Sequence, residues 1–499
     1  MKKVIAVILI GVLVLVGCTG KQEEIKTQET LIVDDYNQID IHKINNYDID
    51  VQFDPKKAKL EVRQRVDYIN QEAVPLDAVY FHLYPNAFKK EESAPFLFDD
   101  FQNAYPEGFV PGFIEVTSIM VNDQDSRSEL MGKGETIMKI VLPQVLQPGQ
   151  RVNIEMRYFV QLPPAQERFG YGESTFNFGN WYPVAAVYDE SGWNLDPYYP
   201  IGDPFYSDTS NYHITIEAPK EFIIAASGNI LENTEKDKNR IWEIEAKLMR
   251  DFAWVASEDF EVEEREVEGT ILKMYYIKDW SLRNDIKEFA ADAAENSLKI
   301  FNKAFGKYPY GQYSVVQTNF PSGMEYPGIV FIGKQYYAKN EKEYLETVIV
   351  HETGHQWWYG VVGNDEIDEA WLDEGLTAYS EVVYAMEKYG EEEGQTYHQY
   401  ENEDMYREME QNLKDVIVLK SLDQFDNWYD YGPLVYSKGA VFVNQLYKKY
   451  GKETLYDIFS AYYDAYRFKI ATTNDFQNIC EQVTGDDLDS LFNEWLLAQ

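Results

Sequence analysis

The sequence HETGH at residues 351–355 carries two histidines four positions apart with a glutamate between them, and WLDEG follows at residues 371–375. On a helix, residues i and i+4 lie on one face, so His351 and His355 can share a metal ion. Glu374 stands nineteen positions after the second histidine, on the next predicted helix, and supplies a third ligand. Two imidazoles and a carboxylate are typical of catalytic zinc, which keeps a fourth position for water. The sequence therefore predicts a site for one Zn²⁺ per chain.

The residues beside these ligands indicate what the site does. Glu352 directly follows the first ligand and can act as general base on the bound water. Glu381 lies seven residues, or about two helical turns, after Glu374. It is a candidate acceptor for the second ring N–H of a metal-bound histidine, although a solvent-exposed helix glutamate is the alternative. The implied reaction is hydrolysis of an amide.

Length and charge restrict the class of protein. A chain of 499 residues can form two or more domains with full cores. Its 45 basic and 85 acidic residues give a net charge of -40. This charge argues against nucleic acid, or an anionic membrane surface, as a partner.

The first residues are typical of a secretory signal. Two lysines precede an apolar run at residues 4–16, and the segment ends in LVGC at residues 15–18. This ending resembles a bacterial lipobox, in which Cys18 is lipidated after removal of residues 1–17. The prediction is a lipid-anchored protein on the extracytoplasmic face of a bacterial cell membrane, with residues 18–33 as a polar tether. An ordinary cleaved signal with a chance cysteine is the alternative.

The mature chain divides into two patterns. Residues 34–268 contain many short runs that alternate polar and apolar residues, such as residues 151–158, and these predict an all-β, saddle-like sandwich domain. Residues 269–499 predict an α+β catalytic domain that is mainly helical toward its C-terminus. Within it we expect helices over residues 280–305 and 341–360 and strands over residues 314–317 and 328–332.

With these residues in view, the chain resembles the gluzincin zinc aminopeptidase family, which includes aminopeptidase N and leukotriene hydrolase. The family pattern is HExxH, eighteen residues, then Glu, as found from His351 to Glu374. The resemblance implies a thermolysin-like fold for the catalytic domain. It also implies a short form, without the C-terminal helical domain of larger relatives and with a more open cleft.

Two further motifs support this resemblance. SGMEY at residues 322–326 is similar to the family's Gly-x-Met-Glu-Asn, with Ser and Tyr in place of the commonest first and last residues. The resemblance implies that Glu325 binds the substrate's free α-amine, beside Gly323 and Met324 in the substrate site. YSKG at residues 436–439 resembles the family's Tyr-x-Lys-Gly, whose tyrosine, here Tyr436, stabilises the oxyanion of the intermediate.

These observations predict a zinc aminopeptidase that removes N-terminal residues from peptides with a free N-terminus. An α-amino group is largely cationic at neutral pH, so a carboxylate such as Glu325 would pair with it and close the cleft to chain interiors. Two alternatives remain open at this point. One is a zinc endopeptidase, and the other is a surface lipoprotein that binds peptides without cleaving them.

Overall fold

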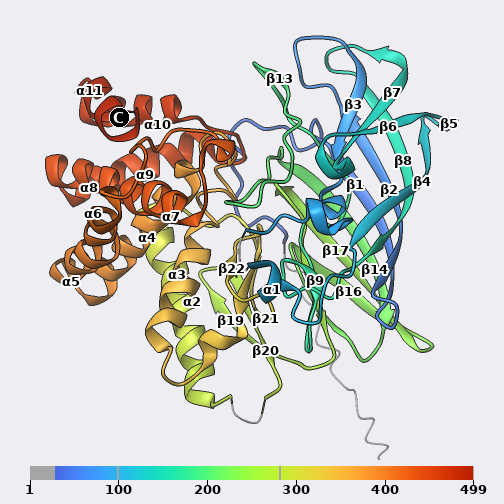
Figure 1. Cartoon of the computed structure of the whole chain (residues 1–499), viewed down its shortest axis with the longest axis horizontal. Helices are drawn as coiled ribbons and strands as arrows, with labels where there is room; N and C mark the ends of the chain where they lie inside the picture. The colour runs from blue at the N-terminus through green and yellow to red at the C-terminus, as the bar shows by residue number, and fades with distance from the viewer. Residues whose placement is uncertain (1–28, 98–99, 280–281, 498–499) are drawn as a thin grey trace, which may run out of the picture.

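The computed structural model describes residues 29–97, 100–279 and 282–497, so the predicted signal at residues 1–17 and the lipidation site Cys18 lie outside the described residues. Figure 1 shows β-sheets on one side of the molecule and helices on the other, with a further sheet below and between them. The predicted order, a β domain and then an α+β unit that becomes mainly helical, is confirmed.

An eight-stranded sheet forms the largest part of the β domain. Its strand order is β16-β17-β14-β1-β2-β8-β4-β5, and β1 pairs with β14 in parallel while the other neighbours are antiparallel. Buried and more exposed residues alternate along β8, as the period-two pattern predicts. The strands are β1 (Asn46–Asp54), β2 (Lys59–Ile69), β4 (Phe113–Val121), β5 (Gln124–Asp125), β8 (Arg151–Gln161), β14 (Ser210–Pro219), β16 (Asn229–Lys236) and β17 (Asn239–Met249).

Two smaller sheets complete the β domain, in the orders β15-β18-β10-β9 and β11-β3-β7-β6, together with the hairpin β12–β13. The ring of Phe53 on β1 lies 5.3 Å from Phe178 and 5.8 Å from Trp254, so aromatic side chains join the first of these sheets to the large one. The strands are β3 (Leu76–His82), β6 (Ser128–Met131), β7 (Ile137–Leu146), β9 (Phe169–Tyr171), β10 (Phe176–Phe178), β11 (Val184–Ala185), β12 (Tyr188–Asp189), β13 (Gly192–Trp193), β15 (Ile223–Ala226) and β18 (Trp254–Ser257).

A five-stranded sheet in the order β19-β20-β21-β23-β22 leads into the helical part. Strands β20, β21 and β23 are parallel, whereas β22 runs antiparallel along the edge. The sheet already begins with β19, which precedes the predicted domain boundary at residue 268. The strands are β19 (Phe260–Val267), β20 (Thr270–Ile277), β21 (Gln312–Thr318), β22 (Gly323–Met324) and β23 (Ile329–Gly333).

Helices make up most of the chain after β23. The helix predicted over residues 341–360 is wrong in its last part, because α3 ends at Gly354 and His355 is its C-cap. Beyond it the backbone turns, so that Trp357 and Trp358 pack in the core instead of continuing a helical face. The main helices are α2 (Asn284–Ala304), α3 (Lys342–Gly354), α4 (Trp371–Tyr389), α5 (Glu391–His398), α8 (Gly439–Tyr450), α9 (Lys452–Tyr466) and α10 (Thr473–Thr484). Shorter ones are α1 (Asp100–Ala104), α6 (Met405–Glu410), α7 (Trp428–Tyr431) and α11 (Asp489–Phe492).

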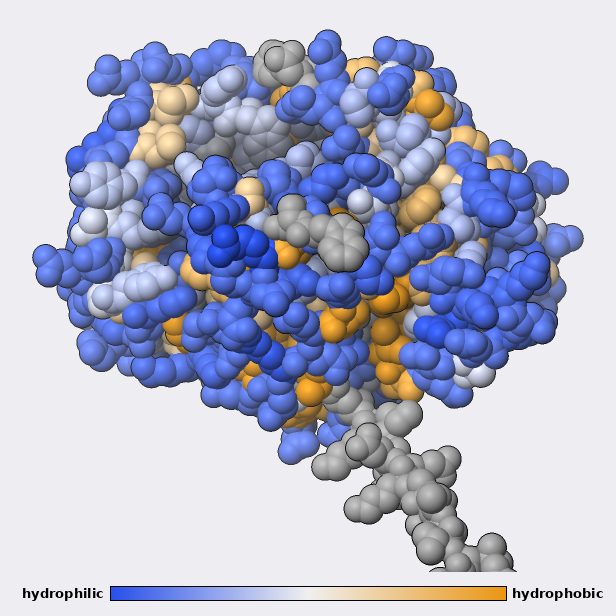
Figure 2. All heavy atoms as spheres, turned by 90° about the horizontal axis from the view of Figure 1, so that it is seen from below, coloured by the Kyte–Doolittle hydropathy of each residue, from blue (hydrophilic) through white to orange (hydrophobic). Residues whose placement is uncertain are grey.

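One hydrophobic cluster runs through both parts of the molecule, from the inner faces of the β-sheets to the buried sides of the helices. Cys480 is a free, buried thiol within it. Hydrophilic residues cover most of the face drawn in Figure 2, in keeping with the acidic composition. None of the helices in the described part of the chain has the length and apolar character that crossing a membrane requires.

Candidate active site

The three predicted metal ligands converge at the meeting point of α3 and α4. The Nε2 atoms of His351 and His355 lie 3.0 Å apart, and Glu374 Oε2 lies 3.2 Å from the first and 3.3 Å from the second. His355 reaches this position from the C-cap of α3, because its own backbone stays in the right-handed helical region. The spacing read from the sequence therefore holds although the helix itself is shorter.

Carboxylates hold the far side of both imidazoles. His351 Nδ1 lies 2.6 Å from Glu381 Oε1, and His355 Nδ1 contacts the buried carboxylate of Asp373. The second oxygen of Glu381 accepts a hydrogen bond from the Tyr397 hydroxyl. Glu381 is thus placed where the two-turn spacing predicts, whereas Asp373 and Tyr397 were not anticipated.

This arrangement fits a zinc ion. Each Nδ1–H can donate to a carboxylate, which leaves a lone pair on each Nε2. The two Nε2 atoms lie 3.0 Å apart and both face one carboxylate oxygen of Glu374. Their lone pairs repel each other unless a cation lies between them. The donor atoms of His351, His355 and Glu374 lie within 4.8 Å of one another, and two nitrogens with one oxygen are the set that catalytic zinc prefers.

Glu352 is positioned as the predicted base. Its side chain is buried, and its Oε2 has no hydrogen-bond partner among the described residues. Burial raises the pKa of this carboxyl to about 7, against the lowering effect of His351 and His355. A Cβ atom built on Gly323 would lie 1.8 Å from Glu352 Oε1, so only glycine leaves room for this carboxylate.

The edge strand β22 presents the predicted amine-binding residue. Glu325 follows the strand directly and is buried, with a carboxylate oxygen that lies within 4.8 Å of Glu352 and His355 ligand atoms. Burial, and then the charge of Asp203, raise the pKa of Glu325 well above its usual range. Met324 is only 1% exposed, and its Sδ lies 3.3 Å from Arg168 Nη1, so its side chain supports the loop from behind.

Tyr436 comes from a π-helical segment, Gly432–Lys438, that precedes α8. Its hydroxyl donates a hydrogen bond to Glu374 Oε1, and its ring stacks on that of His351 at 5.8 Å. Single π-helical turns often occur at functional sites, because the wider turn directs a side chain out of the regular helical register. The phenol therefore lies at the metal-binding residues, as the YSKG motif predicts.

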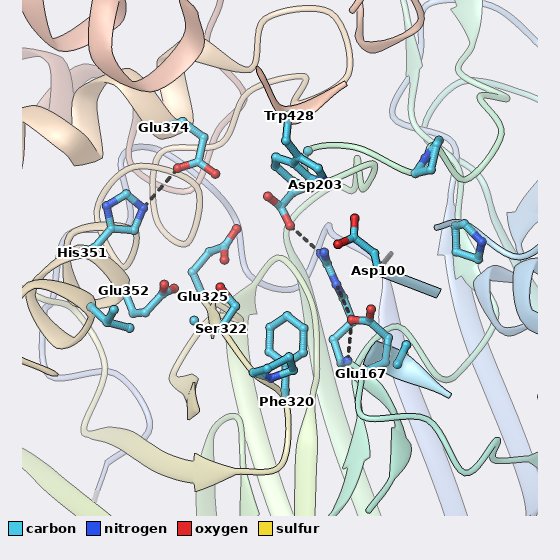
Figure 3. A pocket seen from close by; sticks show the side chains of 18 of the residues that line it. Asp100, Glu167, Asp203, Phe320, Ser322, Glu325, His351, Glu352, Glu374 and Trp428 are labelled. Atoms are coloured by element: carbon cyan, nitrogen blue, oxygen red, sulfur yellow. Dashed lines mark hydrogen bonds and ion pairs between the residues drawn. The ribbon is translucent and has the colours of Figure 1, made fainter. Parts of the chain in front are cut away.

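The three metal-binding residues, together with Glu352, Glu325 and Tyr436, line one cavity of about 580 Å³, and Met324 is not part of its lining. In Figure 3, Glu325 lies between the side formed by His351 and Glu352 and the side that carries Asp203. Arg168 Nη1 is 2.5 Å from Asp203 Oδ1, which places one guanidinium among several carboxylates. The cavity is also lined by residues outside the three motifs: Pro95, Phe96, Asp100, Tyr198, Tyr199, Phe320 and Trp428.

Residues 289–495 match the model of the peptidase family M1 domain. This part of the chain is a peptidase family M1 domain. The M1 match covers α3, α4 and the Tyr436 segment, and it confirms the family that the three motifs indicated.

Named relatives align with about two fifths of the chain. Mouse aminopeptidase B is 29% identical over 198 residues, which are 38% of this chain and 30% of that protein. Leukotriene A-4 hydrolase of Xenopus laevis is 26% identical over 221 residues, or 42% of this chain and 35% of that protein. The chain thus aligns with about a third of the length of these curated relatives.

The similarity of fold extends further. The crystal structure of an M1 zinc metallopeptidase from Deinococcus radiodurans superposes with a TM-score of 0.64 at 16% identity. The superposition covers 94% of this chain and 95% of that one. The β domain and the M1 domain are therefore both present in that fold.

Proposed function

We propose that this protein is a zinc-dependent aminopeptidase that hydrolyses the first peptide bond of peptides with a free N-terminus. One observation carries this proposal: a carboxylate oxygen of Glu325 lies within 4.8 Å of the ligand atoms of Glu352 and His355. The α-nitrogen of a peptide is only about 2.5 Å from the carbonyl carbon of the same residue. An α-amine bound at Glu325 therefore brings the first peptide bond to the base.

His351, His355 and Glu374 would hold the metal, whose chemistry is to polarise the substrate carbonyl and lower the pKa of bound water. Glu352 takes the proton of the attacking water and delivers it to the leaving nitrogen. The Oε2 of Glu352 has no hydrogen-bond partner in the described part of the chain and is available for that proton. The Tyr436 hydroxyl donates a hydrogen bond to the developing oxyanion of the substrate. To do so, it gives up its hydrogen bond to Glu374 Oε1.

Glu325 sets the direction of attack. Its buried carboxylate lies close to Asp203 and Glu352, and this concentration of negative charge favours a cation in the cleft. A peptide α-ammonium supplies that cation, because its pKa is near 8. An internal peptide segment has no charge to offer there and would leave the carboxylate buried and unpaired. The named relatives, an aminopeptidase B among them, agree with this direction.

The experiment compares aminoacyl p-nitroanilides and short peptides with and without a chelator, using wild-type protein and Glu352→Gln. We expect zinc-dependent release of the first residue, and at least a 10²-fold loss in the variant. Glu343→Gln is the matched control, because Glu343 is an exposed glutamate on the same helix. Wild-type activity in Glu352→Gln would refute the mechanism.

N-terminal acetylation separates the remaining functions. An acetylated peptide cleaved as fast as its free-amine form would indicate an endopeptidase. Binding of peptides without turnover by the zinc-loaded protein would indicate a non-catalytic peptide-binding lipoprotein. Only the free-amine form should be a good substrate if Glu325 must pair with an ammonium group.

We also propose that the enzyme consists of a β domain at residues 34–268 and a catalytic domain at residues 269–499, anchored to the outer face of a bacterial cell membrane through Cys18. The pattern of lysines, apolar run and LVGC supports the anchor. Peptides outside the cytoplasm would then be the substrates, and nucleic acids would be excluded by the net charge of -40. Labelling with a palmitate analogue should modify the wild-type protein and leave Cys18→Ala unlabelled.

A further inference from the structure

The residue after Glu325 departs from the motif that this loop resembles, because Tyr326 stands where asparagine is commonest. Its ring is fully buried and lies 5.3 Å from that of Phe331 on the neighbouring strand β23. Its hydroxyl points into the β domain and donates a hydrogen bond of 2.6 Å to Asn180 Oδ1. The two residues are 146 positions apart in the chain, so the bond joins the Glu325 loop to the other domain.

The hydrogen bond continues as a buried chain. Asn180 Nδ2 donates to Asp251 Oδ2 at 2.8 Å, and Asp251 Oδ1 accepts from the Tyr182 hydroxyl at 2.8 Å and from the Phe252 backbone N–H at 2.7 Å. Asn180 has a φ of 48°, a left-handed conformation that asparagine tolerates better than most residues. Because these groups are buried and paired with one another, each fixes the orientation of the next.

The backbone beside Asn180 is shaped for this tyrosine. A Cβ atom built on Gly179 would lie 2.0 Å from the Tyr326 hydroxyl and 2.5 Å from the ring carbon that carries it. Any other residue at position 179 would therefore push the tyrosine away. The pair Gly179 and Tyr326 allows a large side chain to reach across the domain boundary, which an asparagine in the loop would be too short to do.

The opposite side of the loop is tied to the metal-binding segment. Gln356, which directly follows His355, donates from Nε2 to the backbone carbonyls of Glu325 and Tyr326 at 3.3 Å each. Its Oε1 accepts from the Gly328 N–H at 2.8 Å. The Glu325 loop is thus held between the metal site through Gln356 and the β domain through Tyr326.

We infer that Tyr326 is a positioning residue for recognition of the substrate α-amine, and that the buried chain from Tyr326 through Asn180 to Asp251 holds Glu325 at its distance from the metal site. This inference rests on the proposed function, because it assigns Tyr326 a role in the same amine contact. Without the hydroxyl bond, the loop would lose its hydrogen-bonded tie to Asn180 of the β domain, and the Glu325 carboxylate would be held less firmly in its position. The effect should fall on amine binding and leave zinc binding unchanged.

The test uses two zinc-binding ligands that differ only in the α-amine, L-leucine hydroxamate and 4-methylpentanoyl hydroxamate. Calorimetry on the zinc-loaded, full-length protein gives the ratio of their dissociation constants, which measures the amine contact without any turnover. In Tyr326→Phe we expect this ratio to fall roughly tenfold, the effect of losing one buried hydrogen bond. The affinity for the amine-free ligand, and the zinc content, should change less than about twofold.

Two further variants separate positioning from stability. Tyr337→Phe is the matched control, because the Tyr337 hydroxyl is buried without a hydrogen-bond partner among the described residues and its loss removes no bond. Asn180→Gly removes the other end of the Tyr326 bond while tolerating the left-handed backbone. It should reproduce the fall in the ratio, and the double variant Tyr326→Phe/Asn180→Gly should fall no further than either single one.

The outcomes distinguish the two proposals. If Tyr326→Phe and Asn180→Gly weaken both ligands equally, or leave the ratio unchanged, the positioning role is refuted while the aminopeptidase proposal stands. If the wild-type protein itself does not prefer the amine-bearing ligand, amine recognition by Glu325 is wrong and the positioning role falls with it. A variant that does not fold leaves the other single variant to decide.

Discussion

The absence of a side chain at position 323 is what allows Glu352 to stand at the metal site, and Gly323→Ala tests this. The added Cβ would lie 1.8 Å from Glu352 Oε1 and 2.5 Å from its Cδ. Non-bonded atoms of this kind need about 3.5 Å. The carboxylate must therefore retreat by roughly 1.7 Å, which the end of a flexible side chain can do without unfolding the protein.

The size of the effect follows from that displacement. A misplacement of about 1 Å costs around 10²-fold in rate, and a general base as a whole is worth about 10²–10⁴-fold. We therefore expect Gly323→Ala to lower kcat/KM for an aminoacyl p-nitroanilide roughly 10²–10³-fold, or about 3–4 kcal/mol. Zinc content should be unchanged, because the three atoms nearest to the added methyl group all belong to Glu352, which is not a metal ligand.

The matched control is Gly432→Ala, which makes the same chemical change where a Cβ would meet nothing within 4 Å. Activity of that variant should stay near the wild-type value. The double variant Gly323→Ala/Glu352→Gln should be no slower than Glu352→Gln alone, since both changes disable one group. More than a tenth of wild-type activity in Gly323→Ala, or a further loss in the double variant, would refute the reasoning.

Three further changes probe the other groups. Tyr436→Phe removes the predicted oxyanion donor, so kcat should fall about 10²–10³-fold at constant zinc content; an unchanged kcat would exclude that role. Glu381→Gln replaces the carboxylate that contacts His351 Nδ1, so zinc affinity, measured in competition with a chelator, should weaken about 10–100-fold. Unchanged affinity would show that Glu381 does not support metal binding through His351. Burial raises the pKa of Glu387, but its ion pairs with Lys303 and Lys452 outweigh this effect and lower the pKa to about 2. Because the folded pKa lies below the unfolded value of about 4.3, the stabilisation is present above about pH 4.3 and is lost as the pH falls toward 2. Urea unfolding should therefore show Glu387→Gln less stable by about 1–2 kcal/mol at pH 7 and equal to wild type near pH 2; a gap that persists there would contradict this account.

The metal-binding residues could be predicted because their arrangement depends on short-range helical geometry. His351 and His355 lie one turn apart, and Glu374 and Glu381 lie two turns apart on the next helix. The helical period places the two members of each pair on the same face of their helix, and this does not depend on the rest of the fold. The alternation of polar and apolar residues predicted the strands of the β domain for the same reason.

The groups that orient the ligands could be predicted only in part. Asp373 is adjacent to Glu374 in the WLDEG motif, so its acidic character was a usable signal for a contact with His355. Tyr397 offered no such signal, because it is one of 39 tyrosines and reaches Glu381 from a different helix, α5. The cleft wall of Phe320, Tyr198 and Trp428 likewise comes from segments that only the folded chain brings together.

The end of α3 shows why a motif in the catalytic half does not by itself define the site. Tyr359 has a φ of 102°, a strained backbone conformation for a residue other than glycine, and it lies four residues beyond His355. Arg250 of the β domain donates from Nε to the Tyr359 carbonyl at 3.0 Å and from Nη2 to the Lys469 carbonyl at 2.9 Å. A Cβ at Gly363 would lie 2.1 Å from the Arg250 guanidinium carbon, so the returning segment is shaped around it.

The contacts of Arg250 with Tyr359 and Lys469 span 109 and 219 positions in the chain. A local sequence pattern could therefore not predict them. They matter because a strained backbone persists only where its surroundings hold it. Arg250 supplies that constraint just beyond His355, as Tyr326 and Asn180 do beside Glu325. The β domain therefore contributes to the geometry of the catalytic site at two separate points.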